Sequence, residues 1–209
     1  MKHVIKKLCD ILDNLNIDYA LIGGIAAILY GIQRTTLDID VLIGTRSRKD
    51  IISLVSALKD NGFEVVLEEA LQALKERTHF TAIHEGAVLI DFKFASSSLD
   101  FSTLDRRRRF ILNSTVIYIS PLEELITAKL KVLGSLKDIE DALQLMYIFH
   151  DRIDWKLLTR LTNKDHFKFI NRLLKVILDE FSKERRVVKK IRELESLKSK
   201  IEALISFKQ

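Results

Sequence analysis

The chain has 209 residues, 47% of them hydrophobic, so it can bury the core of one or two small domains and is not disordered throughout. Its 34 lysines and arginines against 29 aspartates and glutamates give a net charge of +5, which is compatible with nucleotide or nucleic-acid partners without requiring them. The single cysteine, Cys9, excludes an internal disulfide framework, and the longest apolar run, residues 20–32, is too short to span a bilayer. We therefore expect a cytoplasmic protein with no membrane partner.

Strand and helix patterns alternate in the first part of the chain. An amphipathic helix over residues 2–15 is followed by a short apolar strand and by the glycine pair Gly23-Gly24. Alternating and β-rich segments predict strands over residues 19–22, 37–43, 63–67, 80–83, 87–95, 110–112 and 116–119. Helical spacing predicts helices over residues 25–30, 51–60 and 68–75.

Only helical periods follow the single proline, Pro121. They predict helices over residues 122–133, 138–149, 154–161, 167–181 and 185–205. The expected fold class is α/β (α+β), with a mixed β-sheet flanked by helices and an all-helical C-terminal part. We place the domains at residues 1–119 and 120–209, with the second packed on the first.

Three aspartates lie in apolar strand segments. Asp38 and Asp40 are separated by one residue, so their side chains project from the same side of a strand, where two like charges require a cation. Asp91, in the apolar run 88–94, is the natural third carboxylate. Hard carboxylate oxygens suit two Mg²⁺ ions, with Mn²⁺ as the alternative ion.

A structural interpretation of the same residues is also open. Asp38 could cap a turn, Asp40 could pair with a basic residue, and Asp91 could form a buried salt bridge. The glycine pair before the intervening helix favours a functional site, because glycine backbone can approach a phosphate closely. Arg34 could contact phosphates or brace Asp38.

The helical half carries one further candidate. Lys129 lies on an apolar helix face, where a buried ammonium needs a carboxylate or phosphate partner. Asp138, considered alone, is an acid in the first turn of a helix. The basic runs 106–109 and 183–200 could bind polyanions, but solvated helix and loop surfaces are the more common explanation of such runs.

Together, Ile22-Gly23-Gly24, Asp38-Ile39-Asp40 and the later Asp91 resemble the signature of the polymerase-β-type nucleotidyltransferases. The segment 31–40, with Arg34 and Thr36, is similar to the AbiEii-like branch, which includes toxins of toxin-antitoxin pairs. The helix-borne Lys129 and the helix start Lys137-Asp138, with Asp141 after it, resemble two further motifs of that branch. The sequence departs from these patterns at Gly24, where many members have serine, and at Ser135, where the branch often has arginine.

This resemblance implies a metal-dependent transfer of a nucleoside monophosphate from an NTP to an acceptor such as tRNA or another RNA, with an antitoxin as protein partner. It implies catalytic roles for Asp38, Asp40, Asp91, Lys129 and Asp138, the first three as metal ligands. It also implies nucleotide contacts from Gly23, Gly24, Arg34, Thr36 and Lys137. The alternatives are a nucleotide- or RNA-binding module that keeps the pocket without turnover, and a scaffold that associates through residues 182–209.

Overall fold

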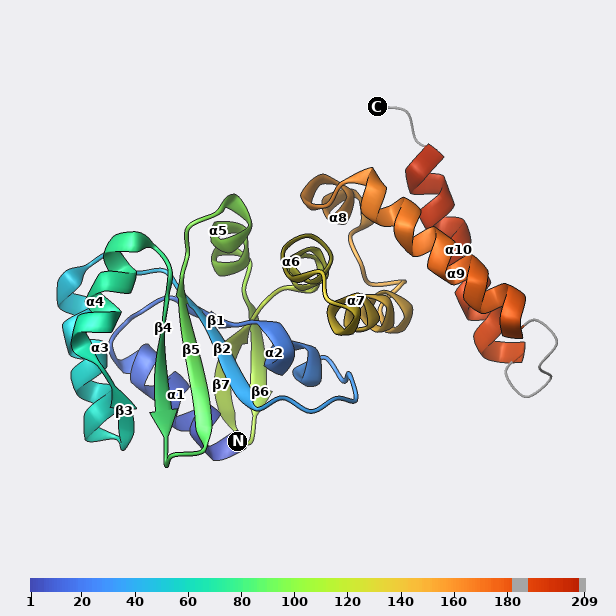
Figure 1. Cartoon of the computed structure of the whole chain (residues 1–209). Coiled ribbons are helices and arrows are strands. Elements are labelled where there is room, and N and C mark those ends of the chain that lie inside the picture. Colours follow the sequence, from blue (N-terminus) through green and yellow to red (C-terminus); the bar gives the residue numbers. More distant parts are fainter. Residues whose placement is uncertain (182–187, 207–209) are drawn as a thin grey trace. The chain divides into compact units, whose positions relative to one another are not determined.

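A computed structural model describes residues 1–181 and 188–206, and the chain divides into two compact units, Met1–Pro121 and Leu122–Gln209 (Figure 1). The division lies two residues beyond the boundary expected from the sequence. Ser120 still belongs to the first unit, because its N–H donates to the Leu21 carbonyl at 2.8 Å and its carbonyl accepts the Tyr30 hydroxyl at 2.9 Å.

The first unit is built on a seven-stranded mixed sheet with the order β3-β4-β5-β2-β1-β7-β6. At its centre, β2 runs parallel to β5 and antiparallel to β1, and β1 runs parallel to β7. This arrangement confirms the predicted fold class. The strands are β1 (Tyr19–Leu21), β2 (Asp38–Ile43), β3 (Phe63–Val65), β4 (His79–His84), β5 (Val88–Phe94), β6 (Arg108–Leu112) and β7 (Thr115–Ile119).

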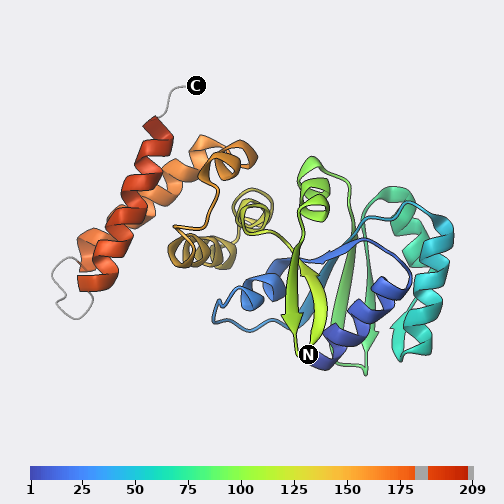
Figure 2. The same cartoon turned by 180° about the vertical axis from the view of Figure 1, so that it is seen from behind.

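The main hydrophobic core lies on one face of this sheet. Helices α1 (Lys2–Asn14), α3 (Arg48–Asp60) and α4 (Leu67–Glu76) contribute buried aliphatic side chains to it, and α1 crosses this face in Figure 2. In β2 the core side chains are Ile39, Val41 and Ile43, so the strand alternation turns the residues between them to the opposite face.

The opposite face carries a smaller apolar cluster that includes Ala20, Leu42 and Leu104. Leu104 comes from α5 (Ser98–Asp105), a helix that the sequence interpretation had not assigned. Its signal was present in the chain: Ser97 accepts the Asp100 N–H and Asp100 accepts the Ser97 N–H, which is a capping box. The missed pattern was a serine followed three residues later by an acid.

Capping and turn residues lie at the ends of the elements, as the sequence predicted. Ser47 caps α3 by accepting the Asp50 N–H, and Gly62 follows the helix with φ +82°. The expected hairpin turn between β4 and β5 has positive φ at both Glu85 and Gly86. Several boundaries differ from the expected ones. For example, α2 (Gly23–Leu29) begins at the glycine pair itself, and β3 ends two residues before the expected limit because Leu67 begins α4.

The second unit is helical throughout its described residues. Asp154 caps α8 by accepting the Leu157 N–H, as predicted, and the long helices α9 and α10 lie side by side (Figures 1 and 2). The expected helix start at residue 185 lies outside the described residues. The helices are α6 (Leu122–Ala128), α7 (Leu136–Ile148), α8 (Trp155–Leu161), α9 (Lys164–Phe181) and α10 (Val188–Ser206).

The continuous helix predicted over residues 122–133 is wrong in one respect. After α6 the backbone continues as a π-helix, η1 (Lys129–Leu133), until Gly134 at φ +64° ends it. Such widened turns occur frequently at functional sites, and this one starts at the buried Lys129. None of the helices within residues 1–181 and 188–206 has both the length and the apolar composition needed to cross a bilayer.

Candidate active site

The three aspartates predicted as metal ligands converge on two adjacent parallel strands. Asp40 of β2 lies directly opposite Asp91 of β5 in the sheet register, and Asp38 lies two residues earlier on the same face as Asp40. One carboxylate oxygen from each of the three lies within 4.8 Å of the other two, and all three residues are partly exposed. The expectation that Asp91 faces the Asp38/Asp40 pair therefore holds.

Strand alternation explains why the carboxylates can gather without entering the core. The residues between them, Ile39, Val41, Ile90 and Phe92, are fully buried on the core face. The carboxylates therefore occupy the opposite, more accessible face, where desolvation of a charge costs less free energy. We call Asp38, Asp40 and Asp91 the aspartate cluster.

Two threonines orient members of the aspartate cluster. The Thr36 hydroxyl donates to Asp38 Oδ1 at 2.5 Å, and the Thr81 hydroxyl donates to Asp91 Oδ1 at 2.7 Å. Thr81 lies on β4 directly opposite Asp91 in the register. Each hydrogen bond limits the rotation of a carboxylate and leaves its second oxygen for other partners.

Gly23 brings the glycine turn against Asp40. The Ile22 N–H donates to the Asp40 carbonyl at 3.0 Å, and Gly23 follows with φ +59°, a conformation that L side chains rarely adopt. A Cβ atom added at Gly23 would lie 2.0 Å from Asp40 Oδ2. Only glycine lets the backbone approach this carboxylate so closely.

Gly24 connects the turn with the loop that precedes β2. A Cβ atom added there would lie 2.8 Å from Thr36 Oγ1 and 3.1 Å from Arg34 Nη2. The side chains of Arg34 and Thr36 therefore lie against the glycine backbone, with Thr36 also bonded to Asp38. The structure thus brings together the predicted site residues of the first unit: Gly23, Gly24, Arg34, Thr36, Asp38, Asp40 and Asp91.

The donor set of the aspartate cluster fits a hard divalent cation. Three carboxylates with oxygens within 4.8 Å of one another concentrate negative charge, and oxygen is the ligand atom that Mg²⁺ and Mn²⁺ prefer. The cluster could hold such ions on the accessible face of the sheet.

The predicted residues of the helical unit form a separate group within that unit. Lys129 is fully buried, and its Nζ lies 3.2 Å from Asp138 Oδ1 and 2.6 Å from Asp141 Oδ2. The buried ammonium therefore has the carboxylate partners that its burial requires. Lys137, in the first turn of α7, is exposed. We call Lys129, Asp138 and Asp141 the lysine cluster.

Asp138 also serves as part of a helix cap. Its backbone N–H donates to Ser135 Oγ, whose hydroxyl donates back to Asp138 Oδ2 at 2.5 Å. Burial acts to raise the pKa of the Asp138 carboxyl, but the hydrogen bonds from Ser135 and Lys129 outweigh it and hold the pKa below its usual value. Asp138 is therefore stabilised as a carboxylate.

Sequence reasoning missed the role of Thr81 at Asp91. A two-residue turn at Glu85-Gly86 would have paired Thr81 with Ile90, but the loop has three residues, 85–87, and His84 pairs with Val88. This shift of one residue places Thr81 opposite Asp91. The hairpin signal was present, but the loop length that sets the register was not resolved from the sequence.

Comparison with known proteins gives a family match over most of the chain. The family model described as "Nucleotidyltransferase of unknown function (DUF6036)" matches residues 1–192. No curated protein matches the sequence.

The solved structures that match this chain share little sequence with it. An antigenic nucleotidyltransferase-like protein from Paracoccidioides brasiliensis is 19% identical, with a TM-score of 0.45 and 92% of both chains covered. The antibiotic-resistance factor ANT(2'')-Ia is 15% identical, with a TM-score of 0.49, over 87% of this chain and 97% of the other. The Thermotoga maritima CCA-adding enzyme, solved with tRNA, is 17% identical, with a TM-score of 0.39, over 93% of this chain and 50% of the other.

Proposed function

The chain belongs to the DUF6036 family of nucleotidyltransferases of unknown function, and we propose that it moves a nucleoside monophosphate from an NTP to an acceptor with the help of divalent cations. The observation that carries this proposal is the convergence of Asp38, Asp40 and Asp91 beside a glycine turn. Mg²⁺ is the proposed ion, with Mn²⁺ as a substitute and two ions per site.

In this proposal the three aspartates share two roles. Asp38 and Asp40 hold the ions, which when bound neutralise phosphate charge and polarise the phosphoryl oxygens. Asp91 completes the ligand set and accepts the proton of the acceptor nucleophile. The nucleophile forms a bond to the α-phosphorus, the bond between that phosphorus and the bridging oxygen breaks, and pyrophosphate leaves with the bonding electrons.

The glycine turn and its neighbours are proposed to bind the triphosphate. The backbone of Gly23 and Gly24 can approach phosphate oxygens because no Cβ atom intervenes. The guanidinium of Arg34 lies against Gly24 and suits two-pronged contact with phosphate oxygens. Thr36 adds a hydroxyl at the same place and orients Asp38.

RNA is the acceptor class that we propose, with tRNA as the first candidate. The net charge of +5 supports a polyanionic acceptor, and the AbiEii-like resemblance of the segment 31–40 favours RNA. A toxin role and an antitoxin partner rest on that resemblance alone. Roles for Lys129, Lys137 and Asp138 in transfer rest on it too, and they remain proposals.

Label transfer from purified protein tests the proposed function. The protein is incubated with each α-³²P-labelled NTP, with tRNA or total RNA, and with Mg²⁺, Mn²⁺ or EDTA. We expect metal-dependent labelling of RNA and release of pyrophosphate. The double variant Asp38→Asn plus Asp40→Asn should transfer label on the order of 1,000-fold more slowly, because several kcal/mol of charge stabilisation are lost.

A matched variant separates this effect from a change in net charge. Asp60→Asn plus Glu64→Gln alters two exposed acids of the same unit and should transfer label at the wild-type rate. Absence of transfer with every nucleotide and ion, together with retained NTP binding, would refute the enzyme and favour the non-catalytic binding module.

A further inference from the structure

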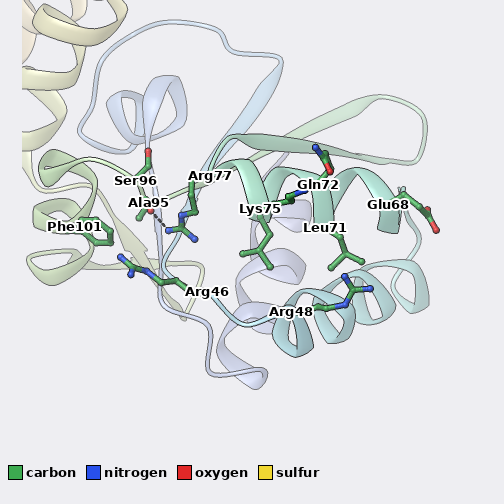
Figure 3. Close-up of a pocket in the computed structure, with 11 residues that line it drawn as sticks. Arg46, Arg48, Glu68, Leu71, Gln72, Lys75, Arg77, Ala95, Ser96 and Phe101 are labelled. Atoms are coloured by element: carbon green, nitrogen blue, oxygen red, sulfur yellow. Dashed lines mark hydrogen bonds between the residues drawn. The ribbon is translucent and has the colours of Figure 1, made fainter.

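A basic pocket lies apart from the aspartate cluster in the first unit (Figure 3). Its cavity has a volume of about 830 Å³ and lies between α4, the start of α3 and the segments that follow β2 and β5. Four basic side chains and one acidic side chain, Glu68, line it. The basic residues, which we call the basic pocket residues, are Arg46, Arg48, Lys75 and Arg77.

The positive charge in this pocket is in excess. No described carboxylate lies within salt-bridge distance of any of the basic pocket residues. The nearby Asp100 is already engaged: it pairs with Lys93 at 2.7 Å and accepts the N–H groups of Ser96 and Ser97. Glu68 and the field of Asp100 offset part of the charge of the four basic side chains, and the pocket keeps a net positive charge.

Arg77 lines the pocket and is oriented by hydrogen bonds to the backbone. Its guanidinium donates to the Thr45 carbonyl at 3.1 Å and to the Ala95 carbonyl, and it lies over the Phe94 ring at 5.5 Å from the centroid. Two carbonyls engage two of its five N–H groups, so others remain available to a ligand. Figure 3 shows Arg77 beside Ala95 and Arg46.

Arg77 also occupies an unusual backbone conformation. It ends α4 with φ +57°, a left-handed position at which glycine or asparagine is usual. A residue with a side chain is strained there, and such strain is often found at ligand-binding positions.

Arg46 places a second guanidinium in the pocket that Arg77 lines. It lies over the Phe101 ring at 5.4 Å from the centroid. Burial and the positive charge of Arg46 both lower the pKa of Arg77 from its usual value. An anion that binds in the pocket relieves this repulsion between the two arginines.

The pocket and the aspartate cluster lie at different positions along the same strands. Arg46 follows the end of β2, and Ala95 follows the end of β5. Ala95 is four residues beyond Asp91, which corresponds to roughly 13 Å at ~3.3 Å per residue. A phosphate bound beside Arg77 is therefore distinct from one bound at the glycine turn.

We propose that this basic pocket is a second anion site, which binds phosphate groups of a phosphorylated ligand outside the aspartate cluster. The partly buried fork of Arg77 binds phosphate oxygens in pairs, and the exposed Arg46, Arg48 and Lys75 add charge around it. The phosphate groups come either from a nucleic-acid strand or from a free polyphosphate, such as that of a nucleotide. The site is independent of whether the protein transfers nucleotides.

Binding measured without metal tests this site, since EDTA removes ion-mediated binding at the aspartate cluster. Tripolyphosphate and a single-stranded RNA 12-mer are titrated separately, by calorimetry and by fluorescence anisotropy. The test variant is Arg48→Ala plus Lys75→Ala, which leaves the hydrogen bonds of Arg77 intact. The control is Lys49→Ala plus Lys59→Ala, which removes the same charge from exposed positions that do not line the pocket.

We expect the test variant to bind one of the two probes at least fivefold more weakly than the control. Weaker binding of RNA by the test variant identifies a nucleic-acid strand as the ligand. In that case the slope of log K against log salt concentration should also become shallower by about 1.4, because two cations are removed. Loss with tripolyphosphate alone identifies a free polyphosphate. Equal binding of both probes by the two variants, or no binding to the wild type, overturns the proposal.

A third variant distinguishes anion binding in the basic pocket from the proposed nucleotide transfer. Asp38→Asn plus Asp40→Asn should retain the binding that Arg48 and Lys75 support, whether or not it transfers nucleotides. If Arg34→Ala, which removes the cation beside the glycine turn, abolishes that binding while its thermal unfolding midpoint is unchanged, the anion is bound at the glycine turn and the second site is refuted.

Discussion

The aspartate cluster and the lysine cluster both concentrate charged side chains, but they combine the charges differently. In the first unit, three partly exposed carboxylates gather with oxygens within 4.8 Å of one another. In the second, one fully buried ammonium is held by two carboxylates at 2.6 and 3.2 Å. The aspartate cluster gathers like charges, whereas the lysine cluster pairs opposite charges.

This difference indicates what each cluster contributes. Like charges on an accessible face are relieved by ions from solution, so the aspartate cluster is arranged for binding. A buried ion pair contributes little net stability over apolar residues of the same shape, but removal of one partner is costly. The lysine cluster is therefore complete within its unit, and the lysine is the residue whose removal should affect folding most.

The largest effect is expected for Lys129→Ala. Without the ammonium, Asp138 and Asp141 remain as partly or fully buried carboxylates, and the free energy of unfolding of the helical unit should fall by about 3–5 kcal/mol. Trp155, the only tryptophan, lies in this unit, so its fluorescence during urea unfolding reports on that unit alone.

A charge-free variant sharpens the same test. Lys129→Met with Asp138→Asn and Asp141→Asn removes the whole group and should recover most of the lost stability. A loss below about 1 kcal/mol for Lys129→Ala would contradict the cluster as a coupled unit. Wild-type label transfer by the stable triple variant would limit Lys129 to a structural role.

Gly23→Ala should disturb the aspartate cluster by displacing Asp40. The new Cβ atom would lie 2.0 Å from Asp40 Oδ2, and a shift of about 1 Å in a catalytic group can cost roughly 100-fold in rate. Initial rates of label transfer measure the effect.

Gly86→Ala is the matched control for that substitution. Gly86 has a similar φ of +63°, but a Cβ atom added there meets nothing within 4 Å. The control therefore carries the same backbone strain without the clash. Equal rates for the two variants would show that Asp40 does not need its present position.

Thr81→Val tests the support of Asp91 and should have a smaller effect. The substitution keeps the shape of the side chain and removes the 2.7 Å hydrogen bond, which is worth about 1 kcal/mol, or roughly fivefold in transfer rate. We also expect the Mg²⁺ concentration for half-maximal rate to rise. Thr81→Ser, which keeps the hydroxyl, should restore both values, and failure to do so would assign the effect to packing.

Among these predictions, we expect the smallest effect from low pH, which should slightly lower the free energy of unfolding of the helical unit. The folded-state pKa of Asp138 is depressed, so its contribution to stability is complete above the unfolded-state pKa of about 3.9 and declines as the pH falls through the lower folded-state value. Trp155 fluorescence in urea between pH 6 and pH 3 measures this decline. Asp138→Asn should flatten the curve below pH 4, and an unchanged slope would refute the contribution of Asp138.

The parts of the fold that could be predicted were those marked by clear patterns of neighbouring residues. The mixed sheet, the helical second half and the Asp154 cap were predictable because alternation, helical spacing and capping residues are local patterns. The π-helix at Lys129–Leu133 was not, because the sequence of this segment has ordinary helical spacing. Helix α5 was missed although the Ser97–Asp100 capping box is also a local signal.

The basic pocket shows the limit of local reasoning about charge. Arg46 and Arg48, Lys75 and Arg77, and the segment after β5 come from three separate parts of the chain. Each group alone is typical of a solvated surface. Their combination in one cavity depends on how α3, α4 and β5 pack, which no single window of sequence reports.

The sequence by itself determined which side chains share a face. Apolar residues alternate with Asp38 and Asp40 in the segment 38–43, and they flank Asp91 in the segment 88–94. The period of a strand therefore sends the carboxylates to one side and the core residues to the other. Only the tertiary structure decided that β2 and β5 are parallel neighbours with Asp40 opposite Asp91. Asp40 and its partner Asp91 are 51 positions apart in the sequence, so their pairing depends on the packing of the whole core. A slip of one residue would have turned Asp91 toward that core.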